Sequence, residues 1–250
     1  MCIRDRALLV PAALLIKEPH ISATALIVMT CIILIFVGGV NLKQFLLIGI
    51  IGAAGALLVV SIMSRNYDYI QKRIQSWVDP FADSQGNTWQ TCQSLIAIGS
   101  GGLFGLGLGE SRQKYLYLPE TKNDFVFSIV CEELGLVGAL TVVLLFTLLV
   151  IRGFYIAMRA KDKFGMLMAI GLTSHIGLQA FFNIAVVSNL IPNTGISLPF
   201  FSYGGTALIL QLAEMGIVLN ISRVRYQSPQ RAPAAERAPQ AEVQLQGGNV

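Results

Sequence analysis

The sequence is short of charged residues and of cysteine. Only 13% of its 250 residues are charged, whereas about 25% is usual in soluble globular domains. This shortage excludes an ordinary soluble domain. A nucleic-acid-binding surface is excluded as well, because the net charge of +4 is gathered in short loops and near the C-terminus. The four cysteines show no paired spacing, so we predict neither a zinc site nor a disulfide framework.

Apolar residues are abundant instead. They make up 54% of the chain, and the mean hydropathy is +0.64. We therefore predict an all-α fold, a polytopic membrane helical bundle. A helix that crosses a membrane needs about 20 predominantly apolar residues. The predicted spans are residues 21–40, 45–63, 125–151, 164–187 and 204–221.

The domain boundaries follow from these spans. The apolar run 7–16 is too short to cross a membrane, so we expect an N-terminally truncated chain whose residues 1–6 are not native sequence. The membrane domain is predicted at 7–225, with a large extracellular loop at 64–124. The tail at 226–250 has too little apolar material to pack, and we expect it to be disordered and cytoplasmic.

Basic residues predict the orientation of the helices. The short segment 152–163 contains four of them, Arg152, Arg159, Lys161 and Lys163. Loops rich in Lys and Arg face the cytoplasm. Counting spans from this loop places Asp124 and the segment 192–203 together on the external face of the membrane.

Asp124 is a candidate catalytic residue. It lies where a polar segment meets an apolar helix, and helical steps from it give a small and polar stripe. The stripe consists of Ser128, Cys131, Glu132, Gly135, Gly138 and Ala139. The opposite side of the helix is predicted to face lipid and consists of Val126, Ile129, Val130, Leu136, Val137 and Leu140. A base there could remove a proton from a sugar hydroxyl while basic residues hold a pyrophosphate. The basic residues of this external region are Arg65, Lys72, Arg73, Arg112, Lys114 and Lys122. The alternative role for Asp124 is to cap the helix.

Other polar groups lie within the spans. His175, Gln179 and Asn183 follow one another at four-residue steps. Ionisable and amide groups at such depth are functional candidates, but we favour interhelical hydrogen bonding for these three. The glycine-rich segment 91–109 is expected to have irregular backbone buried in protein or lining a cavity. It does not predict a phosphate-binding loop, because no strand precedes it.

Several ordered motifs make the sequence similar to the FtsW/RodA/SpoVE family, the SEDS proteins, which polymerise peptidoglycan. These motifs are Gln93-Ser94-Leu95 followed by glycines at 99, 101, 102, 105, 107 and 109; Gln113-Lys114; Tyr117-Leu118-Pro119-Glu120; Asp124-Phe125; Glu132-Glu133-Leu134-Gly135; and Pro192 to Gly205. The amino-acid sequence of these motifs resembles the division and sporulation branch, FtsW and SpoVE, more than the elongation branch. The resemblance implies the C-terminal part of a roughly ten-helix SEDS fold. One departure is Thr121-Lys122-Asn123, which makes the segment before Asp124 more basic than usual.

The resemblance also implies an activity, peptidoglycan glycosyl transfer that polymerises lipid II into glycan strands during cell division or sporulation. Asp124 matches the family's catalytic aspartate and would act as general base, with undecaprenyl pyrophosphate leaving the growing glycan. The expected substrate-binding residues are Glu120, Lys114, Arg65, Arg73, Gln93, Ser202, Tyr203, Gly204 and Gly205. A divalent cation such as Mg²⁺ or Mn²⁺ could bridge the pyrophosphate, but no ligand cluster in the sequence identifies a metal site.

The implied partner is a class B penicillin-binding protein transpeptidase, besides other division proteins. The implied location is the bacterial cytoplasmic (inner) membrane, at the division septum. Two alternatives stay open. One is a lipid II flippase or other polytopic transporter, which the intramembrane polar groups would also suit. The other is a non-catalytic division scaffold.

Overall fold

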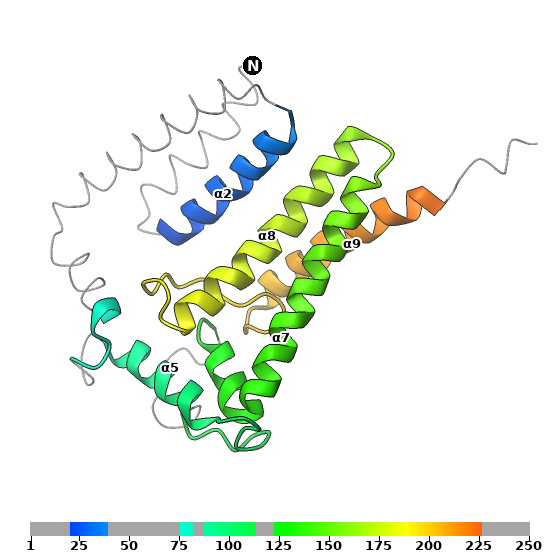
Figure 1. Ribbon diagram of the computed structural model, residues 1–250. Coiled ribbons are helices and arrows are strands. Elements are labelled where there is room, and N and C mark those ends of the chain that lie inside the picture. Colours follow the sequence, from blue (N-terminus) through cyan, green and yellow to red (C-terminus); the bar gives the residue numbers. More distant parts are fainter. Residues whose placement is uncertain (1–20, 40–75, 83–87, 114–122, 227–250) are drawn as a thin grey trace, which may run out of the picture.

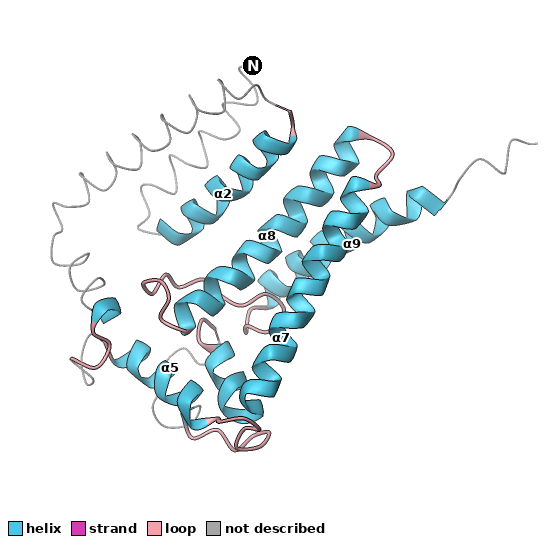
Figure 2. Cartoon of the chain, viewed as in Figure 1, coloured by secondary structure: helices cyan, strands magenta, loops and turns pink. Residues whose placement is uncertain are grey.

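The computed structural model describes residues 21–39, 76–82, 88–113 and 123–226, and this part of the chain is helical (Figures 1 and 2). Its helices are α2 (Ile21–Val37), α5 (Trp89–Ser100), α7 (Val126–Met158), α8 (Lys163–Val187) and α9 (Gly205–Tyr226). The described residues include no strand. Helices α7, α8 and α9 are long and apolar enough to cross a membrane. The predicted all-α, polytopic membrane fold is confirmed.

The predicted spans 21–40, 125–151, 164–187 and 204–221 correspond to α2, α7, α8 and α9, with shifted ends. Helix α7 continues past the predicted end at Ile151 to Met158. Its last turns are held by arginine side chains, since the guanidinium carbons of Arg152 and Arg159 lie 5.1 and 4.1 Å from the ring centroid of Tyr155. The predicted span 45–63 lies outside the described residues.

Helix α8 is central, because it packs against α2, α7 and α9 (Figure 1). Small residues bring α7 and α8 close together. A methyl group added at Gly153 of α7 would collide with Thr173 of α8, and one added at Gly177 of α8 would lie 2.8 Å from Val150 Cγ2. Close backbone approach of this kind is how membrane helices associate without a hydrophobic driving force between them.

Helix α7 is broken at Gly135. This residue has φ 66° and ψ −163°, a conformation that is essentially restricted to glycine. The break removes helical hydrogen bonds, and the glycine-rich loop 101–109 replaces them. Leu106 N and Gly107 N donate to the carbonyls of residues 132 and 133 (3.0 Å each), while residues 136 and 137 donate to Gly102 O and Leu103 O (3.0 and 3.3 Å). The broken helix is thereby satisfied within the protein, as a membrane requires.

The carboxylate of Glu132 fixes the end of the same loop. Its side chain is buried, with 1% exposed, and it accepts hydrogen bonds from Ser111 Oγ and from Arg112 N (3.1 Å). A buried polar group is tolerated when it is hydrogen-bonded in this way. The segment that leads towards Asp124 therefore starts from an anchored point on α7.

The segment 91–109 is irregular only in part, which corrects the sequence prediction. Its first half belongs to helix α5, whose buried face includes Thr91, Ser94 and Ala97 at three-residue steps. Ser94 Oγ donates to Val187 O at the end of α8 (3.0 Å). Because α5 packs against α7, Ile129 is buried rather than exposed to lipid as predicted.

Candidate active site

A cavity of about 250 Å³ opens beside the start of α7. It is lined by Asn123, Asp124, Ser197, Leu198, Ser202, Tyr203, Gly204, Ala207 and Gln211. These residues come from the turn before α7, the loop that follows α8 and the first turns of α9. The predicted meeting of Asp124 with the segment 192–203 is confirmed.

Hydrogen bonds hold the Asp124 turn against that loop. Asn183 of α8 is fully buried, and its Nδ2 donates to Asp124 O and to Ile196 O, at 2.7 Å each. Ser202 Oγ donates to Asn123 O, also at 2.7 Å. These bonds engage the main chain of the turn, so they fix the position of the Asp124 backbone.

The carboxylate of Asp124 lies close to the backbone of Gly195. A methyl group added to Gly195 would lie 3.5 Å from Asp124 Oδ2, and Gly195 has φ +70°, which a residue with a side chain rarely adopts. Gly195 therefore allows the loop to curve past the carboxylate. Asp124 is not the N-cap residue of α7, contrary to the alternative prediction. That position is occupied by Phe125, which makes no side-chain capping bond.

A second cavity, of about 340 Å³, adjoins the first. Both are lined by Ser197, Ala207 and Gln211. The second one also contains His175 Nδ1, which lies 3.4 Å from Glu214 Oε2, and Gln179, whose Nε2 donates to Ser197 O (3.1 Å). The predicted interhelical hydrogen bonding is confirmed for His175, which faces Glu214 of α9, whereas Gln179 and Asn183 bond to backbone carbonyls outside the helices.

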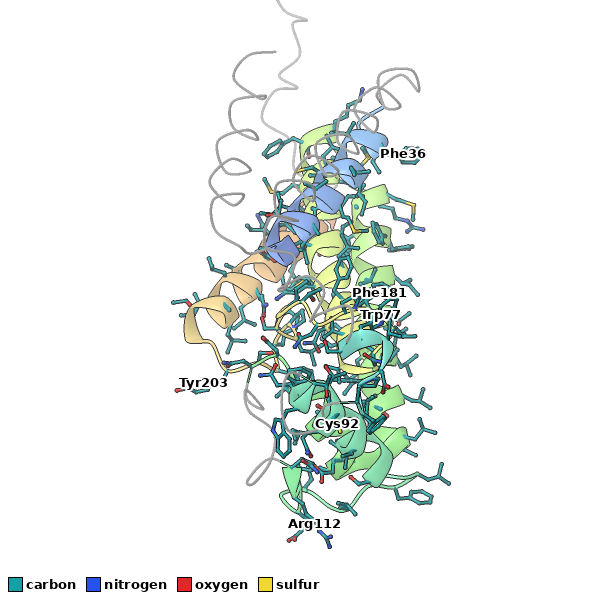
Figure 3. The ribbon with its side chains drawn as sticks, turned by 90° about the vertical axis from the view of Figure 1, so that its left-hand side faces the viewer. Phe36, Trp77, Cys92, Arg112, Phe181 and Tyr203 are labelled. Atoms are coloured by element: carbon teal, nitrogen blue, oxygen red, sulfur yellow. The ribbon has the colours of Figure 1, made fainter. Side chains whose placement is uncertain are left out.

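The structure brings together some of the predicted site residues. Asp124, Ser202, Tyr203 and Gly204 line one cavity, and Tyr203 projects away from the helices with 82% of its surface exposed (Figure 3). Gly205, which begins α9, and Gln93, which is buried on α5, are not among the lining residues. The predicted substrate-binding residues Arg65, Arg73, Lys114 and Glu120 lie outside the described residues.

Sequence reasoning missed several members of this cavity. Ser197 and Leu198 belong to the segment 192–203 that is predicted to meet Asp124, but the sequence does not single them out as site residues, and nothing in the spacing of Ala207 relates it to Asp124. Gln211 is recognisable as a polar residue in an apolar span; its Oε1 accepts from Phe200 N (2.9 Å). Its amide group thereby connects α9 to the loop that faces Asp124.

The described residues do not assemble a metal site. Within them, no group of three or more His, Cys, Asp or Glu side chains could hold a metal ion. Asp124 is the one carboxylate among the described residues that line the first cavity, together with hydroxyl and amide groups. Mg²⁺ binds through one or two carboxylates plus substrate phosphates, so this donor set would hold such an ion only together with the phosphates of a substrate.

Replacing Asn183 with leucine is expected to lower the thermal unfolding midpoint of the detergent-solubilised protein. The change leaves two carbonyl oxygens, Asp124 O and Ile196 O, without their donor, and each orphaned buried group costs about 1–3 kcal/mol. Ser188→Ala on the same helix is the matched control, because Ser188 Oγ bonds only to carbonyls of α8 itself, such as Ile184 O (2.7 Å). Equal midpoints for the two variants would contradict the role given to Asn183.

Comparisons with known proteins agree with this architecture. A family model described as "Cell cycle protein", FTSW_RODA_SPOVE, matches residues 1–227. Stage V sporulation protein E of Bacillus subtilis (strain 168) is 47% identical over 206 residues, which are 82% of this chain and 55% of that protein. The probable peptidoglycan glycosyltransferase FtsW of the same organism is 43% identical over 219 residues, 86% of this chain and 54% of that protein. The chain thus spans about half the length of the curated relatives that it matches.

Solved structures share the fold. A chain in "Structural coordination of polymerization and crosslinking by a peptidoglycan synthase complex" superposes with a TM-score of 0.67 and 30% identity, over 88% of this chain and 61% of that one. The rod shape determining protein RodA of Thermus thermophilus gives a TM-score of 0.57 and 27% identity, over 91% and 57%.

Proposed function

The chain belongs to the FtsW/RodA/SpoVE family of cell cycle proteins, and we propose that it is the part of a peptidoglycan glycosyltransferase that carries the general base. The observation that supports this most is the position of Asp124. Its carboxylate lines a cavity between the first turn of a membrane helix and the 192–204 loop. A lipid-linked sugar needs a site of this kind, where a polar cavity meets the edge of a bilayer.

The proposed reaction is glycosyl transfer between lipid II and the growing glycan. Asp124 accepts the proton of the acceptor's sugar hydroxyl, whose oxygen bonds to the anomeric carbon of the glycan that is being extended. The bond from that carbon to the pyrophosphate oxygen breaks, and undecaprenyl pyrophosphate leaves. Basic residues outside the described part, Arg65, Arg73 and Lys114, are proposed to hold the pyrophosphate, because charge-assisted hydrogen bonds stabilise a departing anion.

Neutral groups around Asp124 suit a sugar substrate. Ser197, Ser202, Tyr203 and Gln211 bring hydroxyl and amide groups to the same cavity. The described residues that line it include no Arg or Lys. We therefore assign this cavity to the sugar end of the substrate, and we assign the pyrophosphate to basic residues outside the described part of the chain.

The proposal extends to partners and location. One solved structure with a similar fold belongs to a peptidoglycan synthase complex whose polymerization and crosslinking are coordinated. This supports a class B penicillin-binding transpeptidase as the partner of the full protein. The proposed location is the bacterial cytoplasmic membrane at the division septum, with the Asp124 cavity on the external side and the C-terminus in the cytoplasm.

Transport of lipid II is the second candidate, and the adjoining cavity favours it. His175, Gln179 and Glu214 bring polar groups to this cavity among the helices, and transporters place such groups within the bilayer. Polymerisation predicts glycan strands when the purified full-length protein and its transpeptidase partner receive labelled lipid II. Transport predicts movement of lipid II across vesicle membranes without any polymer, and that result would overturn the assignment.

A further inference from the structure

The loop between α5 and Gln113 exposes large apolar side chains. Leu103, Phe104, Leu106 and Leu108 are 62, 84, 43 and 78% exposed. The residues from Gly101 to Gly109 are all glycine, leucine or phenylalanine, and the first charged residue that follows is Glu110. Contiguous apolar surface of this kind marks contact with a membrane or a partner.

Hydrogen bonds fix the position of this loop relative to α7. Gly102 O and Leu103 O accept from the amides of Leu136 and Val137, which begin the continuous helical part of α7 after the break. The exposed side chains of this part, Leu136 and Val137 at 50 and 55% and Leu140 at 58%, continue the apolar surface of the loop. A helix that crosses a bilayer turns such residues towards acyl chains, so the loop lies beside a stretch of α7 that is suited to face lipid.

The backbone of the loop is also prepared for contact with lipid. Irregular backbone is excluded from hydrocarbon unless its polar groups are bonded within the protein. Leu106 N and Gly107 N donate to α7, Gly105 N donates to Gly101 O (2.8 Å), and Gly107 O accepts from Glu110 N (3.2 Å). The leucine and phenylalanine side chains can therefore contact acyl chains while these peptide groups stay paired.

We propose that residues 103–108 insert their side chains into the headgroup and acyl boundary of the membrane leaflet on the Asp124 side. Glu110 and Arg112 mark the point where the chain returns to water, and Arg112 projects at the end of the molecule opposite Phe36 (Figure 3). This inference rests on the membrane-crossing character of α7 and is independent of the proposed glycosyl transfer.

The test is tryptophan fluorescence of the full-length protein in vesicles of phosphatidylglycerol and phosphatidylcholine. All native tryptophans, including Trp77 and Trp89, are replaced with phenylalanine. Three single-tryptophan variants are then compared, Phe104→Trp, Leu108→Trp and, as the control, Arg112→Trp. Lipids brominated near the headgroup should quench roughly half of the emission at positions 104 and 108, since tryptophan is favoured at this boundary. The control should be quenched little by lipid and strongly by iodide in the water.

Two results would overturn the inference. One is quenching at positions 104 and 108 that equals the control with both quenchers, which would leave the loop in water. The other is emission that brominated lipid does not affect but that becomes protected from iodide when the transpeptidase partner is added, which would make this surface a protein interface. Leu108→Trp keeps the test decisive if Phe104→Trp fails to fold.

Discussion

Replacing Asp124 with asparagine is expected to lower glycan polymerisation by the full-length protein about 10²- to 10⁴-fold, the usual contribution of a general base. Asparagine has nearly the same shape, and the contact from Asn183 Nδ2 is made to the main-chain carbonyl of residue 124. The turn should therefore keep its position. What the variant loses is a group able to accept the proton, so the loss should appear in the rate and not in the folding.

The measurement is the rate of polymer formation from lipid II, together with protein abundance and the thermal unfolding midpoint. Asp162→Asn is the matched control. Asp162 caps α8 by accepting from Gly165 N (2.8 Å), which an asparagine carbonyl can also do, and it precedes α8 at the end remote from the Asp124 cavity. Wild-type polymer yield from Asp124→Asn would reject Asp124 as the base. A fall in yield that merely follows a fall in abundance would make the residue structural.

Replacing Gly135 with alanine is expected to destabilise the described bundle strongly and to lower its thermal unfolding midpoint. An L-residue at φ 66° and ψ −163° costs about 1–3 kcal/mol. The added methyl group would also collide with the backbone at Leu103 and Gly105, and overpacking costs about a further 1–3 kcal/mol. Neither neighbour can turn away, because both are backbone atoms. These costs together are a large part of the 5–15 kcal/mol by which proteins are typically stable.

Gly216→Ala on α9 is the control for that substitution. An added methyl at Gly216 would meet nothing within 4 Å, and alanine is favoured over glycine inside a helix by roughly 0.5–1 kcal/mol. The control should therefore unfold at the same temperature as the parent or slightly above it. The readouts are yield after detergent extraction and the unfolding midpoint. A Gly135→Ala protein as stable as its Gly216→Ala counterpart would show that the loop yields at this point.

The positions of the membrane helices could be predicted because long apolar runs leave the chain few other options. The meeting of Asp124 with the 192–203 loop was equally accessible, since it follows from the number of crossings between them. Asn183 shows where this reasoning stops. Its four-residue spacing predicts a hydrogen bond, but its two acceptors lie in different segments. The packing of α8 against the turn before α7 and against the 192–203 loop decides which carbonyls it reaches.

The break in α7 could not be foreseen for a similar reason. In the sequence, Gly135 is one of several small residues on one face of a predicted helix. Small residues in such a position are usually explained by close helix packing. Its unusual backbone depends on donors and acceptors that the distant segment 101–107 supplies. Likewise, nothing in the periodicity of α5 shows that its burial against α7 would shield Ile129 from lipid.

The pairing of the 101–109 loop with α7 also constrains the length of that loop. Two carbonyls, at Gly102 and Leu103, and two amides, at Leu106 and Gly107, must reach their partners on either side of Gly135 at once. One inserted or deleted residue between Leu103 and Leu106 would shift either the two carbonyls or the two amides out of hydrogen-bonding register with α7. Surface loops ordinarily accept changes in length, but this one should tolerate altered side chains far better than an altered number of residues.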